Sequence, residues 1–177
     1  MSKYNNIFLV GPMGAGKTTV GRRLAEARGM EFIDSDHEVE SRTGVNINFI
    51  FEKEGEAGFR RRECAAIADL AARENLVLST GGGAILDPEN RRLLAEHGFV
   101  VYLYASVEQQ IARTERTDNR PLLRVGDRRE TLQRLFQIRD PLYREIADLV
   151  VNTDGRNARL LSRDIEDRLV RAIQQLR

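Results

Sequence analysis

Residues 11–18 combine glycines, a lysine and a threonine at the spacing of a phosphate-binding loop. They read Gly-Pro-Met-Gly-Ala-Gly-Lys-Thr, which fits the pattern G-x-x-x-x-G-K-[ST], and they follow the apolar run Ile7–Val10. In such a loop the glycines let backbone N–H groups point at phosphate oxygens, and the next helix adds its positive end. We expect Lys17 to bind a nucleotide's terminal phosphates and Thr18 to supply a hydroxyl for Mg²⁺. The alternative is that these residues form a glycine-rich turn that binds nothing.

Lys17 is an exception in this chain, because only three of the 28 basic residues are lysines and all the others are arginines. A guanidinium is flat and forked, whereas an ammonium is a compact charge on a flexible stem. A tight loop therefore favours lysine at this position.

Two carboxylates follow the second apolar run. Asp34 and Asp36 come directly after residues 32–33, and alternate positions of an extended segment point the same way. One carboxylate can hold water ligands of Mg²⁺ while the other orients an acceptor hydroxyl or takes its proton during phosphoryl transfer. The alternative is that one or both only cap the helix that begins near His37.

Three consecutive glycines, Gly81, Gly82 and Gly83, follow the third apolar run and Thr80. Glycine lets a ligand approach the main chain closely, but three in a row cost conformational entropy. This favours binding of a small polar substrate over a plain turn. Many nucleotide hydrolases with a phosphate-binding loop carry a metal-orienting aspartate at the end of the corresponding third strand. Here the metal's carboxylate must come from elsewhere, and the Asp34–Asp36 pair is the obvious source.

Most of the arginines are expected to be solvated. Arg120 stands next to Pro121 in a polar segment over residues 117–128, which is typical of a mobile loop. We expect its guanidinium to swing over the transferring phosphate and stabilise its charge. Arg60, near the aspartates in sequence, and Arg139, beside Pro141, are weaker candidates when taken alone.

The elements that must position these residues alternate along the chain. Five short apolar runs, separated by helix-length segments, cover residues 7–10, 32–33, 76–78, 99–104 and 149–151. Such continuous hydrophobicity is typical of strands covered on both faces, and the intervening helices provide the crossovers that parallel pairing requires. The pattern predicts a three-layer α/β/α sandwich around a five-stranded parallel sheet, with the ligand beyond the carboxyl ends of the strands.

Composition excludes several classes of function. The chain of 177 residues suggests a single domain, and 28 basic against 27 acidic residues leave no basic stripe for nucleic acid. Apolar runs are too short for membrane insertion or secretion, so we expect a cytoplasmic protein. One cysteine, Cys64, and two histidines without neighbours at metal-ligand spacing make disulfide and zinc chemistry improbable.

Together these residues resemble the shikimate kinase family, small monomeric enzymes that phosphorylate a hydroxyl of shikimate with ATP and Mg²⁺. The resemblance runs almost end to end. Beyond the phosphate loop and its continuation Val20-Gly21-Arg22, it is carried by residues 32–36, 50–63, 80–83, 119–123 and 139–143. The ordered set is far more specific than any one segment, although residues 46–49 are more polar than the family pattern suggests.

The resemblance implies a fold of the P-loop nucleoside monophosphate kinase type, with strand order 2-3-1-4-5. It implies one kinase domain over residues 1–177, with a substrate-binding region at about residues 34–62 and a lid at about residues 113–127. The implied reaction transfers the γ-phosphate of ATP to the 3-hydroxyl of shikimate, giving shikimate 3-phosphate and ADP, a step of chorismate and aromatic amino-acid biosynthesis.

The resemblance also implies a role for each matching residue. The ATP phosphates would be held by Gly14, Ala15, Gly16, Lys17, Thr18 and Thr19. Mg²⁺ would be held by Thr18 and, through water, by Asp34. Shikimate would be bound by Asp36, which would also act as the base, by Gly82 at a ring hydroxyl, and by Arg60 and Arg139 at the carboxylate. Arg120 would come from the lid, Arg113 would lie against adenine, and Arg156 would belong to a loop closing over the base.

Two other functions stay open at this point. The phosphate loop alone would suit a nucleotide-dependent switch, but the chain has no Asn-Lys-x-Asp guanine reader and no Asp-x-x-Gly after the third apolar run. A kinase for another small acceptor, such as a sugar acid or a nucleoside monophosphate, is disfavoured by the constellation of Arg60, Gly82 and Arg139. Two arginines and an aspartate suit a hydroxy acid better than a nucleobase.

Overall fold

The computed structural model describes residues 3–115 and 127–175. Its five strands form one parallel sheet with the order β2-β3-β1-β4-β5, which confirms the expected architecture. The strands are β1 (Ile7–Val10), β2 (Glu31–Asp34), β3 (Leu76–Ser79), β4 (Phe99–Tyr104) and β5 (Leu149–Asn152). Three of them are slightly longer than the apolar runs that predicted them, because the polar residues Glu31, Asp34, Ser79 and Asn152 also pair in the sheet.

Seven α-helices and two short 3-10 helices connect these strands in the described part of the chain. They are η1 (Lys3–Asn5), α1 (Lys17–Arg28), α2 (Ser35–Thr43), α3 (Ile47–Ala71), η2 (Ala84–Leu86), α4 (Pro88–His97), α5 (Val107–Thr114), α6 (Arg128–Ile146) and α7 (Ala158–Gln174). Their ends follow local rules. Gly29 ends α1 in the left-handed conformation with φ 62°, and the Asp87 side chain caps α4, whose first residue is Pro88.

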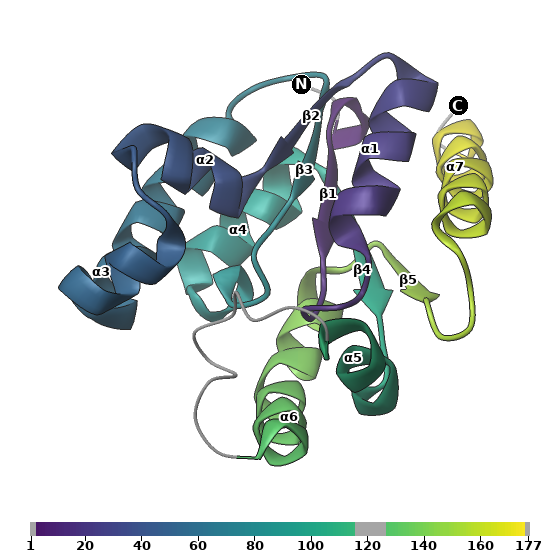
Figure 1. Ribbon diagram of the computed structural model, residues 1–177. Coiled ribbons are helices and arrows are strands. Elements are labelled where there is room, and N and C mark those ends of the chain that lie inside the picture. The colour runs from purple at the N-terminus through teal and green to yellow at the C-terminus, as the bar shows by residue number, and fades with distance from the viewer. Residues whose placement is uncertain (1–2, 116–126, 176–177) are drawn as a thin grey trace.

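The helices lie on both faces of the sheet, with α1 and α7 on one face and α3, α4 and α6 on the other (Figure 1). Strand β1 shows why. Ile7 and Leu9 pack in the cluster with α1 and α7, whereas Phe8 and Val10 pack in the cluster on the opposite face. All four side chains are at most 1% exposed, so this central strand is covered from both sides.

Helix α7 carries apolar residues at spacings of three or four. Leu161, Ile165 and Leu169 are buried against the sheet, and Ile173 is partly buried beside them. Leu176, which continues this spacing in the sequence, lies outside the described residues. Among the described residues, none of the helices combines the length and the apolar character needed to cross a membrane.

Helix α3 is interrupted at Gly55, whose φ of 71° and ψ of −178° suit only glycine. A separate small core, formed by Val39, Ile50, Phe59 and Ala66, joins α2 to both parts of α3. The segment at residues 59–63 lies inside α3, just after this break. Its placement carries Arg60 toward the carboxyl edge of the sheet.

Candidate active site

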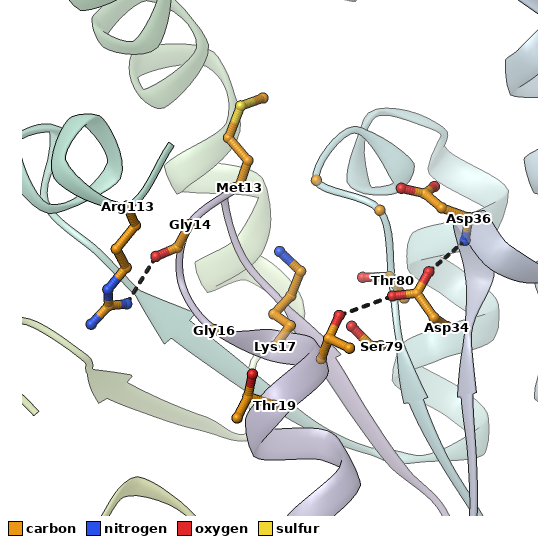
Figure 2. A pocket seen from close by; sticks show the side chains of 13 residues that line it. Met13, Gly14, Gly16, Lys17, Thr19, Asp34, Asp36, Ser79, Thr80 and Arg113 are labelled. Atoms are coloured by element: carbon orange, nitrogen blue, oxygen red, sulfur yellow. Dashed lines mark hydrogen bonds between the residues drawn. The ribbon is translucent and has the colours of Figure 1, made fainter. Parts of the chain in front are cut away.

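A pocket of about 290 Å³ opens at the carboxyl ends of β1, β2 and β3, as the topology predicts (Figure 2). The phosphate loop carries Lys17 on one side, and the end of β2 and the start of α2 carry Asp34 and Asp36 on the other. The loop after β3 completes the wall. The lining residues are Met13, Gly14, Gly16, Lys17, Thr18, Thr19, Asp34, Asp36, Ser79, Thr80, Gly81, Gly82 and Arg113.

The phosphate loop needs its glycines for conformation and for space. Gly14 and Gly16 have φ of 78° and 87°, in the left-handed region that favours glycine. Gly11 has φ of 147°, and a Cβ there would lie 2.5 Å from the carbonyl oxygen of Leu103 on β4. Gly16 is the N-cap of α1 and makes no side-chain cap hydrogen bond. The first N–H groups of α1 therefore remain available to an anion at the pocket.

The Lys17 ammonium is held by its own loop. Its Nζ donates to the carbonyl oxygens of Gly11 at 2.7 Å and Pro12 at 2.8 Å, and the residue is only 9% exposed. These acceptors are neutral, so the positive charge is not cancelled by them. A buried ammonium at the rim of a pocket is suited to a multiply charged anion.

Asp34 has two structural partners. Its Oδ1 accepts from the backbone N–H groups of Asp36 at 2.9 Å and His37 at 3.2 Å, which makes it the N-cap of α2. Its Oδ2 accepts from the Thr18 hydroxyl at 3.1 Å. The capping alternative for the aspartate pair thus applies to Asp34, and one of its oxygens still faces Thr18.

Thr18 and Asp34 form a donor set that fits Mg²⁺. Both offer oxygen, the ligand atom that this hard cation prefers, and they lie together at the rim where the phosphates of a nucleotide would lie. Mg²⁺ commonly binds through one or two protein oxygens together with substrate phosphates and water. These two residues are therefore consistent with the metal role expected of them.

Asp36 and Glu63 converge on Gly81. A Cβ built on Gly81 would lie 2.6 Å from Oδ1 of Asp36 and 2.9 Å from Oε2 of Glu63. The Gly81 N–H donates to the hydroxyl of Ser35 at 2.9 Å, which ties the glycine segment to the start of α2. Only glycine leaves room here for two carboxyl groups.

The other two glycines face the two expected acid-binding arginines. A Cβ on Gly82 would lie 3.4 Å from Nη1 of Arg139, and a Cβ on Gly83 would overlap the guanidinium of Arg60. The structure thus brings Asp36, Arg60, Gly82 and Arg139 together around residues 81–83. These four come from α2, α3, the loop after β3 and α6.

The two arginines differ in how their charges are balanced. Arg60 donates to Glu63 at 2.9 Å and also pairs with Glu56 at 3.3 Å. Arg139 is only 4% exposed, its Nε has no hydrogen-bond partner, and it has no ion pair within the described part of the chain. The Glu63 carboxyl group interacts with it electrostatically, but a buried guanidinium without a salt bridge is costly on its own, so its position favours an anionic ligand.

Glu63 received no role from the sequence. Burial raises the pKa of its carboxyl group to about 7, against the opposing charge and hydrogen bond of Arg60, and the charge of Asp36 raises it further. Burial also lowers the pKa of Arg60, but the charges of Glu63 and Glu56 outweigh burial and raise it overall. The spacing of three residues between Arg60 and Glu63 on one helix could have indicated this pair.

The arginines expected near the adenine differ in their surroundings. Arg113, in α5, donates to the carbonyl oxygen of Gly14 at 2.8 Å and to that of Thr153 at 3.1 Å, so it lies against the phosphate loop (Figure 2). Arg156 follows β5 and pairs with Asp164 of α7 at 3.3 Å, and it does not line the pocket. Arg120 and most of the predicted lid lie outside the described residues.

Comparison with known proteins places this geometry in a family. The shikimate kinase family model matches residues 13–174. A shikimate kinase of Pseudomonas fluorescens is 60% identical over 164 residues, which cover 93% of this chain and 95% of that protein.

Solved structures agree. A structure of the Acinetobacter baumannii shikimate kinase in complex with shikimate has a TM-score of 0.93 and 54% identity, covering 96% of this chain and 94% of that one. A gluconokinase from Sinorhizobium meliloti has a TM-score of 0.66 at 23% identity, over 99% and 97% of the two chains, and shares the fold alone. On the family match and these close relatives, the chain belongs to the shikimate kinase family.

Proposed function

We propose that this protein transfers the γ-phosphate of ATP to the 3-hydroxyl of shikimate, forming shikimate 3-phosphate and ADP. One observation carries the choice of an acidic acceptor. The buried Arg139, without a carboxylate partner in the described residues, lies beside Arg60 at the glycine segment. Two forked guanidinium groups suit a planar carboxylate, which a neutral sugar does not have.

The proposed chemistry begins at the acceptor hydroxyl. Arg60 and Arg139 hold the carboxylate, and Gly82 contacts a ring hydroxyl, so that the 3-hydroxyl points from Asp36 toward the nucleotide. The carboxylate of Asp36 accepts the hydroxyl proton while the oxygen forms a bond to the γ-phosphorus. The bond between that phosphorus and the bridging oxygen breaks, and its electron pair stays on the β-phosphate of ADP.

The phosphate loop positions the nucleotide in this proposal. The N–H groups of residues 14–19 bind the phosphate oxygens, and the Lys17 ammonium exchanges its carbonyl partners for the β- and γ-phosphates, where charge develops during transfer. Mg²⁺, held by Thr18 and through water by Asp34, would neutralise part of that charge when bound.

The remaining assignments are proposals of the same kind. Arg113 lies against the adenine, Arg156 belongs to the loop over the base, and Arg120 reaches the transferring phosphate from the lid at about residues 113–127. We also propose a single domain that works as a monomer in the cytoplasm, without nucleic acid or membrane partners.

An acceptor panel tests the reaction. ADP release, followed with a coupled assay, should require shikimate and stay at background with gluconate, with adenylate or without any acceptor. The variant Asp36→Asn should bind ATP nearly as the wild type does but lose phosphoryl transfer to shikimate, because an amide cannot take the proton. Nucleotide hydrolysis without an acceptor would support the switch function, and unimpaired turnover of Asp36→Asn would contradict the role of that carboxylate.

A further inference from the structure

The hydroxyl of Tyr143 is the feature of the site that the mechanism has not used. Tyr143 belongs to α6, one turn after Arg139, and is only 2% exposed. Its hydroxyl donates to the carbonyl oxygen of Gly82 at 2.5 Å. It is therefore a direct polar link between the helix that carries Arg139 and the glycine segment.

The same hydroxyl also interacts with Arg139. Burial raises the pKa of Tyr143, and the charge and hydrogen bond of the Arg139 guanidinium act against that increase. A phenolic oxygen can accept one hydrogen bond while its hydrogen is donated elsewhere. The Arg139 guanidinium thus acts on the Tyr143 hydroxyl, and it also lies close to Gly82, whose carbonyl oxygen accepts the hydrogen bond of that hydroxyl.

The hydrogen bond from Tyr143 to Gly82 fixes more than one atom of the glycine segment. A peptide group is planar, so holding the Gly82 carbonyl also sets the direction of the Gly83 N–H. Gly83 in turn is covered by the guanidinium of Arg60, and Gly82 approaches Arg139. Gly81 and Gly83 are held by other hydrogen bonds, from the Gly81 N–H to Ser35 and from the N–H groups of Ala84 and Leu86 to the carbonyl oxygens of Gly81 and Gly83, and the Tyr143 hydroxyl adds a hydrogen bond at Gly82 between them.

We propose that Tyr143 is a positioning residue for acid recognition, whose hydroxyl holds Gly82 and Arg139 in a fixed relation so that a small hydroxy acid meets both in one geometry. This inference rests on the proposed function. It predicts that the hydroxyl contributes to binding of the acceptor and not to binding of the nucleotide, because its hydrogen bond goes to Gly82 and not to the phosphate loop.

The variant Tyr143→Phe tests the proposal, and Tyr102→Phe is a matched control. Tyr102 is fully buried, and its ring lies 4.9 Å from the Tyr143 ring between centroids. Its hydroxyl donates to Asp140 at 2.6 Å and not to the glycine segment. Both variants lose one buried hydroxyl from the same pair of rings, so a loss of stability alone would affect both.

Steady-state kinetics with each substrate varied should separate them. Tyr143→Phe should raise KM for shikimate about tenfold, the size of one lost hydrogen bond, and change KM for ATP less than about twofold. Tyr102→Phe should change both constants less than about twofold. An unchanged KM for shikimate in Tyr143→Phe, or an equal rise in Tyr102→Phe, would overturn the proposal. A wild-type chain inactive with shikimate would instead refute the proposed function.

Hydrogen exchange of the wild-type chain covers the case in which Tyr143→Phe does not fold. Added shikimate should slow amide exchange in residues 81–86 and in residues 139–146 together, because the hydroxyl joins the two segments. Protection confined to one segment would contradict the link.

Discussion

Replacing Gly83 with alanine should reduce catalytic activity with little effect on the stability of the fold. Gly83 has φ of −93° and ψ of −1°, which alanine adopts without strain, so the backbone does not oppose the change. The new methyl group would overlap the Arg60 guanidinium, which lies at the free end of a long side chain and can move. We therefore expect little loss of stability, together with a displaced acid-binding group.

The size of the effect follows from that displacement. A methyl group needs normal van der Waals distance, so the guanidinium must move by about 1 Å, and a misplacement of about 1 Å can cost about 100-fold in rate. We expect kcat/KM for shikimate to fall about 100-fold, or about 2.7 kcal/mol, with KM for ATP unchanged. The ion pair of Arg60 with Glu63, now 2.9 Å long, would be disturbed at the same time.

A double-mutant cycle provides the test. In an Arg60→Ala background the guanidinium is gone, so Gly83→Ala should cost almost nothing further, and the two effects on kcat/KM should be strongly non-additive. Additive losses would refute the reasoning, because they would show that the methyl group acts on something other than Arg60. Urea unfolding of each variant should confirm that the fold is retained.

Two further predictions concern stability. The pKa of Glu63 is raised from 4.5 to about 7, so the folded chain keeps a proton that the unfolded chain releases, and stability should fall as pH rises from about 4.5 to about 7. Glu63 faces Arg60, Asp36 and Arg139, and its share of this loss of stability is about 3 kcal/mol. Urea unfolding at several pH values should show that the free energy of unfolding declines less steeply with pH in Glu63→Gln than in the wild type. Equal slopes in the two proteins would count against the buried proton. Gly11→Ala should lower the free energy of unfolding by about 1–3 kcal/mol more than Gly29→Ala. The reason is that a Cβ on Gly11 would lie 2.5 Å from the Leu103 carbonyl oxygen, whereas a Cβ on Gly29 would have no neighbour within 4 Å. Similar Tm values for the two variants would contradict this.

The parts of the site that the sequence predicts are those identified by short patterns of neighbouring residues. The phosphate loop has a fixed spacing, and the strands are short apolar runs, so both could be located without a structure. The residues after each strand then follow from topology, because parallel strands bring their carboxyl ends to one edge. This reasoning placed Asp36 and Gly82 at the pocket correctly.

The parts that it missed depend on contacts between distant segments. Glu63 is one of many acidic residues until folding buries it beside Arg60 and Asp36. Tyr143 gains its partner Gly82 only when α6 packs over the loop after β3. Asp34 caps α2 with one carboxylate oxygen and accepts a hydrogen bond from Thr18 with the other. This combination of contacts likewise depends on tertiary structure. Such pairings have no periodicity along the chain.

The order of the strands has a consequence for synthesis. Strand β1 is the first of the five along the chain, yet its neighbours are β3 and β4, with Ile7 opposite Val77 and Phe99. A ribosome must therefore release some seventy residues or more, by the separation of residues 7 and 77, before β1 can pair with a neighbouring strand. Until then the nascent protein carries an apolar strand with unpaired edges, and such edges promote aggregation while folding is incomplete.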